Sequence, residues 1–263
     1  MQINEYPNLD ATAAYRSLRQ YALLNIKSLL SPERVRDYCI DAGGDLRFSY
    51  AGAPVDFTVI RLFQDLANEQ RLLEQFEKLR SGEYVNVGEN RMVLHHLTRA
   101  PLGSPVTHEG VNLRKFYAEQ TARIADFSGK VHDGTITGST GKPFRNVVQI
   151  GIGGSDLGPR ALYIALENWA KKAGRLYLPA RFLSNVDPDD AYEVLSGLDP
   201  ETSLFILVSK SGTTQETLAN HRLVEQWMRD TGVPGVDPAG HMIAVTAKGS
   251  PLAESSGFLD SFY

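Results

Sequence analysis

Two short segments of the chain combine glycines with hydroxyl side chains in a way that suits an anion. Residues 151–159 read GIGGSDLGP and residues 209–217 read SKSGTTQET. Glycines allow positive φ angles and let a ligand approach backbone amides, while hydroxyl groups add further donors. Each segment follows a short apolar run and precedes a stretch with helical spacing. Because amides in the first turn of a helix lack intrahelical partners and attract negative charge, the two segments predict a phosphate site.

Each segment also has a purely structural interpretation. In 151–159 the glycines could serve turn geometry alone, and Ser155 and Asp156 stand where G-x-G-x-x-G requires its last glycine. No Gly-Lys-Ser/Thr follows, as a Walker motif would require. In 209–217 a hydroxyl could be a helix N-cap, but one cap needs one hydroxyl and this segment holds five. Lys210 could be a solvated loop charge, and Glu216 is interpreted as complementing the dipole of its helix.

The elements that must position these segments alternate between strand and helix. Apolar runs predict strands at 146–151, 181–185, 203–209 and 241–246, and helical spacing lies between them at 158–172, 188–195 and 215–230. Such alternation favours parallel pairing through crossover connections, and continuous apolar strands indicate a sheet covered on both faces. We predict an α/β fold with a doubly wound parallel sheet for residues 130–263.

Residues 1–129 are predicted to form a mainly helical segment. Helical spacing covers 10–40, 56–80 (one helix or a pair), 91–98 and 112–127, the last ended by Ser128-Gly129. Ser31-Pro32 has the composition of a helix start. Gly43-Gly44 indicates a turn before a short strand or extended arm at 45–50.

Composition narrows the classes of protein. Hydrophobic residues make up 42% of the chain, charged residues 22%, and the net charge is −4, which is typical of a soluble globular protein without a nucleic-acid surface. The single cysteine, Cys39, can form neither an internal disulfide nor a metal site alone, and we interpret it as a small buried apolar residue. The N-terminus is polar, and no run reaches the roughly 18 apolar residues of a membrane helix. We expect a cytoplasmic protein that binds no membrane.

The two loops resemble those of the sugar isomerase (SIS) domain, and the whole chain is similar to the glucose-6-phosphate isomerase family. The first segment resembles the family's signature turn, and SKSGTTQET resembles its second signature, SKTFTTQET. ENRMVLH at 89–95 resembles ENRAVLH, while KGSP at 248–251 and GFLD at 257–260 match the approach to the next family motif. These matches follow the family's order from about residue 45 to the last residue.

The resemblance implies which residues bind substrate: Gly154, Ser155, Ser209, Lys210, Ser211, Gly212, Thr213 and Thr214. The first two would help hold the substrate, and Ser209, Ser211 and Thr214 would bind its phosphate. Ser211-Gly212 departs from the family's Thr-Phe, which keeps the hydroxyl but removes an aromatic ring and leaves the packing there open. No histidine lies in a context that resembles the family's ring-opening histidine.

The resemblance also implies a function, the interconversion of glucose 6-phosphate and fructose 6-phosphate through a cis-enediolate. A homodimer is expected for the full-length enzyme, with no metal or organic cofactor. The family's catalytic glutamate, ring-opening histidine and lysine follow segments that lie beyond residue 263. We therefore expect a truncated chain with the first SIS domain only, which binds sugar phosphate and contains no catalytic residue.

Two other functions share parts of this pattern. A non-catalytic SIS-domain sensor of sugar phosphates would share the two loops, but the ENR, GSP and GFLD segments disfavour it. A nucleotide-binding α/β enzyme is disfavoured because a Walker lysine is missing and the second loop is rich in hydroxyls.

Overall fold

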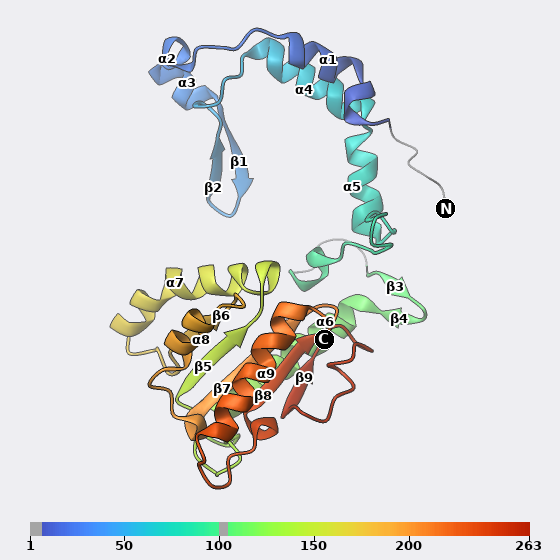
Figure 1. Ribbon diagram of the computed structural model, residues 1–263. Helices are drawn as coiled ribbons and strands as arrows, with labels where there is room; N and C mark the ends of the chain where they lie inside the picture. Colours follow the sequence, from blue (N-terminus) through green and yellow to red (C-terminus); the bar gives the residue numbers. More distant parts are fainter. Residues whose placement is uncertain (1–6, 100–104) are drawn as a thin grey trace. The chain divides into compact units, whose positions relative to one another are not determined.

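The computed structural model describes residues 7–99 and 105–263 (Figure 1). The chain divides into two compact units, Met1–Arg114 and Lys115–Tyr263. The domain boundary expected between residues 129 and 130 falls inside helix α6 (Leu113–His132). This boundary stays a prediction. In the described part of the chain, no helix combines the length and apolar character needed to cross a bilayer.

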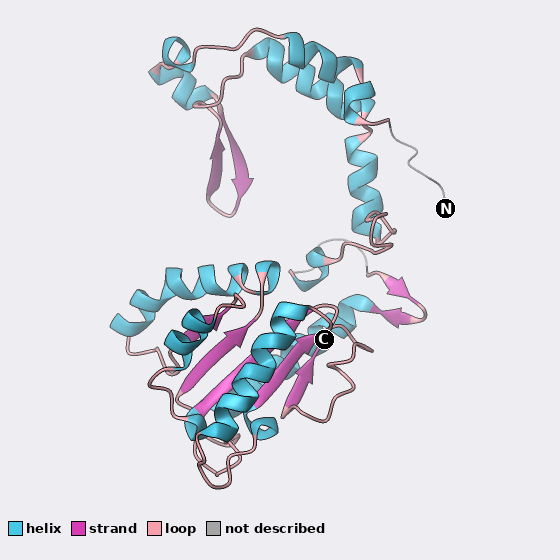
Figure 2. Ribbon diagram, viewed as in Figure 1, coloured by secondary structure: helices cyan, strands magenta, loops and turns pink. Residues whose placement is uncertain are grey.

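The second unit is built on a five-stranded parallel sheet (Figure 2). Its order is β6-β5-β7-β8-β9. The strands are β5 (Asn146–Ile150), β6 (Ala180–Leu183), β7 (Ser203–Ser209), β8 (Met242–Thr246) and β9 (Asp260–Phe262). The crossover helices are α7 (Leu157–Lys172), α8 (Pro188–Leu195) and α9 (Gln215–Asp230). The predicted α/β class with a parallel sheet is confirmed; only β9, a three-residue edge strand without an apolar run, was not predicted.

Side chains from the sheet enter two separate hydrophobic cores. One core joins Val148 and Phe205 to Val224 of α9, all completely buried. The other joins Leu204 to Phe127 of α6. Because successive strand residues point to opposite faces, Leu204 and Phe205 show directly that both faces of β7 are covered. Burying a side chain of this size stabilises the fold by about 1.5–3 kcal/mol, so this two-sided packing fixes the strand ends that carry the candidate site.

The first unit is mainly helical, as predicted. Its elements are η1 (Leu9–Ala11), α1 (Ala13–Gln20), α2 (Ile26–Leu29), α3 (Pro32–Asp37), α4 (Phe57–Glu69), α5 (Leu72–Ser81), η2 (His95–Thr98), and two hairpins, β1 (Cys39–Gly43) with β2 (Leu46–Ser49) and β3 (Thr107–His108) with β4 (Val111–Asn112). Ser31 caps α3 by accepting a bond from Arg34 N at 3.1 Å. Cys39 is half-buried in β1 rather than in a core.

Two predicted helix bounds are wrong. The helix expected over 91–98 is reduced to η2, because Asn90 adopts a φ of 51° and a turn brings Asn86 and Arg91 together in a β-bridge. The helix expected to end at Ser128-Gly129 continues to the end of α6, because Val131 is buried in the core one turn further on.

Helix α6 ends at His132, and Gly134 terminates it. The φ of Gly134 is 80°, and the chain closes there with bonds from Gly134 N to Val131 O at 3.3 Å and from Ile136 N to Lys130 O at 2.9 Å. A left-handed glycine just after the last turn is a frequent helix terminator. Gly129 lies inside the helix, and a glycine alone does not end a helix whose next turn is buried.

Candidate functional site

The two predicted segments leave the sheet at the same edge. β5 and β7 are hydrogen-bonded in parallel, with Ile150 opposite Leu207. Both strands therefore end at the carboxyl edge of the sheet, where α/β proteins bind ligands, and each is followed by its glycine-containing turn (Figure 1). β8 ends there as well, with Thr246 opposite Ser209.

The first turn folds back tightly on the end of β5. Gly151 has no room for a side chain, because a Cβ there would lie 2.6 Å from Ser155 O. The side chain of Gln149 donates from Nε2 to the same carbonyl at 2.7 Å. A short 3₁₀-helix, η3 (Gly153–Ser155), follows. Gly154 is exposed and Ser155 is partly exposed, so both predicted residues of this turn reach solvent.

An ion pair between the buried Asp156 and the partly exposed Arg160 supports the first turn, and sequence reasoning missed it. Asp156 is 3% exposed and lies 3.0 Å from Arg160 Nη2. The same Nη2 donates to Ser184 Oγ at 3.0 Å, which ties the start of α7 to the end of β6. The spacing of four residues between the carboxylate and the guanidinium on a predicted helix was the available signal.

The second turn has a buried inner side. Ser209 is 2% exposed, and its Oγ lies 3.0 Å from Thr214 Oγ1. The same Oγ accepts a bond from Gly212 N at 3.2 Å. Gly212 is buried with a φ of 70°, and a Cβ there would lie 3.1 Å from the Cβ and Oγ of Ser250. The glycine at position 212, where the family has an aromatic residue, is thus packed against Ser250, and this contact leaves little room for a side chain.

The outer side of the second turn presents hydroxyl groups to solvent. Lys210, Ser211 and Thr213 are exposed, and Thr214 is partly exposed. Ser211 Oγ accepts bonds from Thr213 N at 3.1 Å and from Thr213 Oγ1 at 3.0 Å. A hydroxyl that accepts two bonds still has its own proton to donate, and because Ser211 is exposed this proton is available to an external acceptor.

The helices behind the two turns begin without side-chain caps. Asp156 and Thr214 occupy the N-cap positions of α7 and α9, and neither side chain accepts a capping bond from the backbone of its helix. By contrast, Asp187 caps α8 with bonds from Asp189 N and Asp190 N at 2.9 and 3.3 Å. The interpretation of the hydroxyl-rich segment as an N-cap therefore fails, since Thr214 turns its hydroxyl toward Ser209. The first-turn amides of α7 and α9 are left uncapped at the edge where the turns lie.

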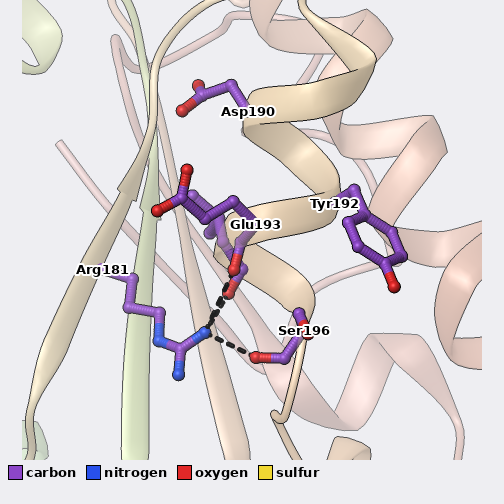
Figure 3. A pocket seen from close by; sticks show the side chains of 6 residues that line it. Arg181, Asp190, Tyr192, Glu193 and Ser196 are labelled. Carbon is purple, nitrogen blue, oxygen red and sulfur yellow. Dashed lines mark hydrogen bonds between the residues drawn. The ribbon is translucent and has the colours of Figure 1, made fainter.

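We interpret a hollow elsewhere in the second unit as part of the structural support of α8 (Figure 3). It lies beside β6 and α8 and is lined by Arg181, Asp190, Tyr192, Glu193, Val194 and Ser196. Arg181 Nη1 donates to the carbonyl oxygens of Val194 at 2.6 Å and Ser196 at 2.8 Å. A guanidinium at a helix carboxyl end satisfies exposed carbonyls and the negative end of the dipole, so we interpret this arginine as a C-terminal cap of α8.

His241 is a buried structural residue that the sequence did not reveal. It is completely buried at the end of η5 (Pro238–His241). Its Nδ1 lies 3.1 Å from Ser203 O, while Nε2 accepts a bond from Ser139 N at 3.1 Å. Burial lowers the pKa of His241, and these partners fit a neutral ring with its proton on Nδ1. Among residues 7–99 and 105–263, no three His, Cys, Asp or Glu side chains gather so as to hold a metal ion.

Comparison with known proteins gives consistent results. A sequence model of the family described as phosphoglucose isomerase matches residues 49–257. A glucose-6-phosphate isomerase of Treponema denticola is 48% identical and that of Borreliella burgdorferi 39% identical, each over 98% of this chain. A crystal structure of a glucose-6-phosphate isomerase from Chlamydia trachomatis has a TM-score of 0.79 and 32% identity over 98% of this chain. The chain covers 50%, 49% and 48% of these three proteins, respectively, and so spans about half their length.

Proposed function

The chain belongs to the phosphoglucose isomerase family, and we propose that its part in that enzyme is to bind the phosphate of glucose 6-phosphate or fructose 6-phosphate. The observation that carries this proposal is the pair of uncapped helix starts behind neighbouring parallel strands. A phosphate dianion needs several donors, and bonds to a charged acceptor are stronger than neutral ones. Uncapped amides and exposed hydroxyls at one sheet edge supply such donors without a large net charge.

In the proposed complex, the second turn binds the phosphate. Ser211 and Thr214 donate their hydroxyl protons, and Ser209 takes part through Thr214, because its own proton goes to Thr214 Oγ1. Lys210 adds positive charge, and Gly212 and Thr213 complete the turn. Gly154 and Ser155 of the first turn hold the substrate from the adjacent strand.

The isomerisation itself needs further groups. Moving a proton between C1 and C2 requires a base and stabilisation of the enediolate. We propose that the base and the groups that stabilise the enediolate are supplied by residues outside this 263-residue sequence. This chain would then bind sugar phosphate without isomerising it. The full-length enzyme is expected to act as a homodimer in the cytoplasm, without a metal or organic cofactor.

Isothermal titration calorimetry on the 263-residue chain tests the binding. Fructose 6-phosphate should bind and unphosphorylated fructose should not. The double variant Ser211→Ala, Thr214→Val should weaken binding at least tenfold, about the effect of removing one or more hydrogen bonds to a charged group. The control is Ser196→Ala, an exposed serine at the end of α8, which should bind as the parent chain does.

Three results would contradict the proposal. Equal affinity for fructose and its phosphate would exclude phosphate recognition, and preferential binding of ATP would favour a nucleotide enzyme. Substantial turnover in a coupled assay by the 263-residue chain would show that the base lies within it.

A further inference from the structure

A buried hydroxyl on the neighbouring strand β8 is hydrogen-bonded to the start of the second turn. Thr246, the last residue of β8, is 5% exposed, and its Oγ1 donates to Ser209 O at 2.7 Å. The same Oγ1 lies 2.7 Å from the Oγ of Ser250, which is 7% exposed. The single proton of Thr246 is used on Ser209, so Ser250 must donate to Thr246. Ser250 Oγ in turn accepts from Ala253 N at 3.2 Å.

The result is a directed chain of three hydrogen bonds that ends on the backbone of the turn. It runs from Ala253 N through the two hydroxyls to Ser209 O, and consecutive bonds of this kind strengthen one another. A fourth bond, from Ala247 N to Lys210 O at 3.1 Å, joins the same two segments. Gly212 packs directly on Ser250, so the segment 246–253 supports the turn by contact as well.

These bonds decide where the amides of the turn point. A trans peptide places its N–H opposite its C=O, and the described residues contain no cis peptide bond. The carbonyl of Ser209 is directed at Thr246, so the N–H of Lys210, in the same peptide plane, points away from the segment 246–253. By the same reasoning, the bond from Ala247 to Lys210 O turns the N–H of Ser211 away from that segment.

We propose that Thr246 and Ser250 are positioning residues for the phosphate-binding turn, an inference that rests on the proposed function. They hold two peptide planes so that the amide of Ser211 is presented as an anion donor together with the Ser211 hydroxyl, and so that the carbonyl of Ser209 points away from the anion. Without the Thr246 hydroxyl, the carbonyl of Ser209 keeps the bond from Gly212 N at 3.2 Å but loses its hold on segment 246–253, and rotation of this peptide would turn its carbonyl dipole toward the phosphate.

The test compares variants that differ in one hydroxyl. Thr246→Val keeps the shape and removes the bond, whereas Thr246→Ser keeps the hydroxyl. The matched control is Ser203→Ala at the other end of β7, because Ser203 is also fully buried and also donates to a backbone carbonyl, that of Asp199, at 2.8 Å. Fructose 6-phosphate and inorganic phosphate are titrated against each variant of the 263-residue chain, and the free energy of unfolding is measured in urea.

Thr246→Val should weaken the binding of both ligands about tenfold. The affinities of Thr246→Ser and Ser203→Ala should lie within about twofold of that of the parent chain. The comparison with Ser203→Ala separates positioning from stability, because that variant also loses a buried hydrogen bond. Unchanged affinity in Thr246→Val, or an equal loss in Ser203→Ala, would overturn the inference.

A second measurement keeps the inference testable if the parent chain binds neither ligand, a result that would refute the proposed function. Amide hydrogen exchange at Gly212 and Ala247, the donors that join the turn to its own start and to segment 246–253, should accelerate in Thr246→Val but not in Thr246→Ser or Ser203→Ala. Unchanged exchange at both amides would overturn the positioning role by itself.

Discussion

Gly212 has two separate reasons to be a glycine. Its φ of 70° lies in the left-handed region, where an L-residue costs about 1–2 kcal/mol. It is also buried against Ser250 and the backbone of Leu252, whose N would lie 3.3 Å from an added Cβ. The first reason is shared by many turn glycines, whereas the second is particular to this site.

A pair of substitutions separates the two reasons. Gly232 has a φ of 65° and open space around its Cβ position, so Gly232→Ala should lower the free energy of unfolding by about 1–2 kcal/mol from the backbone alone. Gly212→Ala should lower it by a further ~1–3 kcal/mol, because the methyl group overpacks a buried contact. Urea denaturation of both variants measures the difference, and equal losses would show that the contact with Ser250 yields without cost.

His241 makes stability depend on pH. Burial lowers its pKa, while the nearby carboxylates of Asp237, Glu201 and Asp199 oppose that shift. The residues that face its ring, Ser139, Ser203 and Phe144, carry no ionisable side chain. Folding therefore favours the neutral ring, and protonation would bring a second N–H against the amide of Ser139.

We predict a loss of stability on mild acidification. The unfolded ring titrates near about pH 6.5, so the contribution of His241 is fully present above that pH and is lost as the pH falls through the lower folded-state pKa. His241→Gln should remove this part of the pH dependence between pH 7.5 and 5.5, as measured by urea denaturation. Burial also lowers the pKa of His221, but that contribution is common to both proteins and cancels in the comparison.

If His241→Gln does not fold, the wild-type chain still allows a test. An NMR titration of the His241 ring should give a pKa below the ordinary histidine value. A value at or above about 6.5 would contradict the prediction.

At the scale of the element, α6 shows how packing overrides a local stop signal. The pair Ser128-Gly129 has the composition of a helix end, yet the helix continues because Phe127 and Val131 are both buried against the sheet. Burial of such side chains contributes more than the roughly 0.5–1 kcal/mol that an interior glycine costs. The helix ends at His132, and the glycine with a positive φ, Gly134, follows two residues later.

Replacing Gly129, inside α6, and Gly134, just after it, by alanine should change the free energy of unfolding in opposite directions. Gly129 is exposed in the helix with open space around its Cβ position, so Gly129→Ala should raise the free energy of unfolding by about 0.5–1 kcal/mol. Gly134→Ala would meet Pro143 only at an ordinary contact distance of 3.7 Å but must adopt a φ of 80°, so it should lower that energy by about 1–2 kcal/mol. Thermal unfolding measures both, and a destabilising Gly129→Ala would indicate that α6 is broken at that residue.

At the scale of the whole molecule, the two units differ in their own cores. The second unit contains both clusters of buried hydrophobic side chains. In the described part of the first unit, many large apolar side chains of the helices and of the hairpin β1–β2 are exposed, among them Phe48 at 58%, Phe57 at 77% and Leu73 at 83%. A two-stranded hairpin without a core is marginally stable by itself.

Native-state hydrogen exchange should reveal this difference. Amides of β5 and β7 should exchange slowest, near the rate set by global unfolding, because they lie between two buried layers. Amides of β1, β2 and α4 should exchange through local opening at least tenfold faster. Equal protection in both units would show that they unfold together and that the first unit draws stability from contacts outside itself.

The sequence by itself determined the periodic elements and the positions of the two turns. Short continuous apolar runs such as 203–209, bounded by turn residues, favour strands buried on both faces, and the glycines and hydroxyls that follow them predict turns that could face a ligand. The pattern also predicts that the two turns lie at one sheet edge, since parallel strands end together. These features depend on residues that are neighbours in the chain, and local sequence is enough to read them.

Only the tertiary structure decided which residues support the two turns. That Thr246 holds the second turn from an adjacent strand is a consequence of contacts across the sheet. The same holds for the bond between Arg160 and Ser184 and for the burial of His241. Contacts between residues distant in sequence depend on which strands become neighbours, and no local pattern of residue types contains that information.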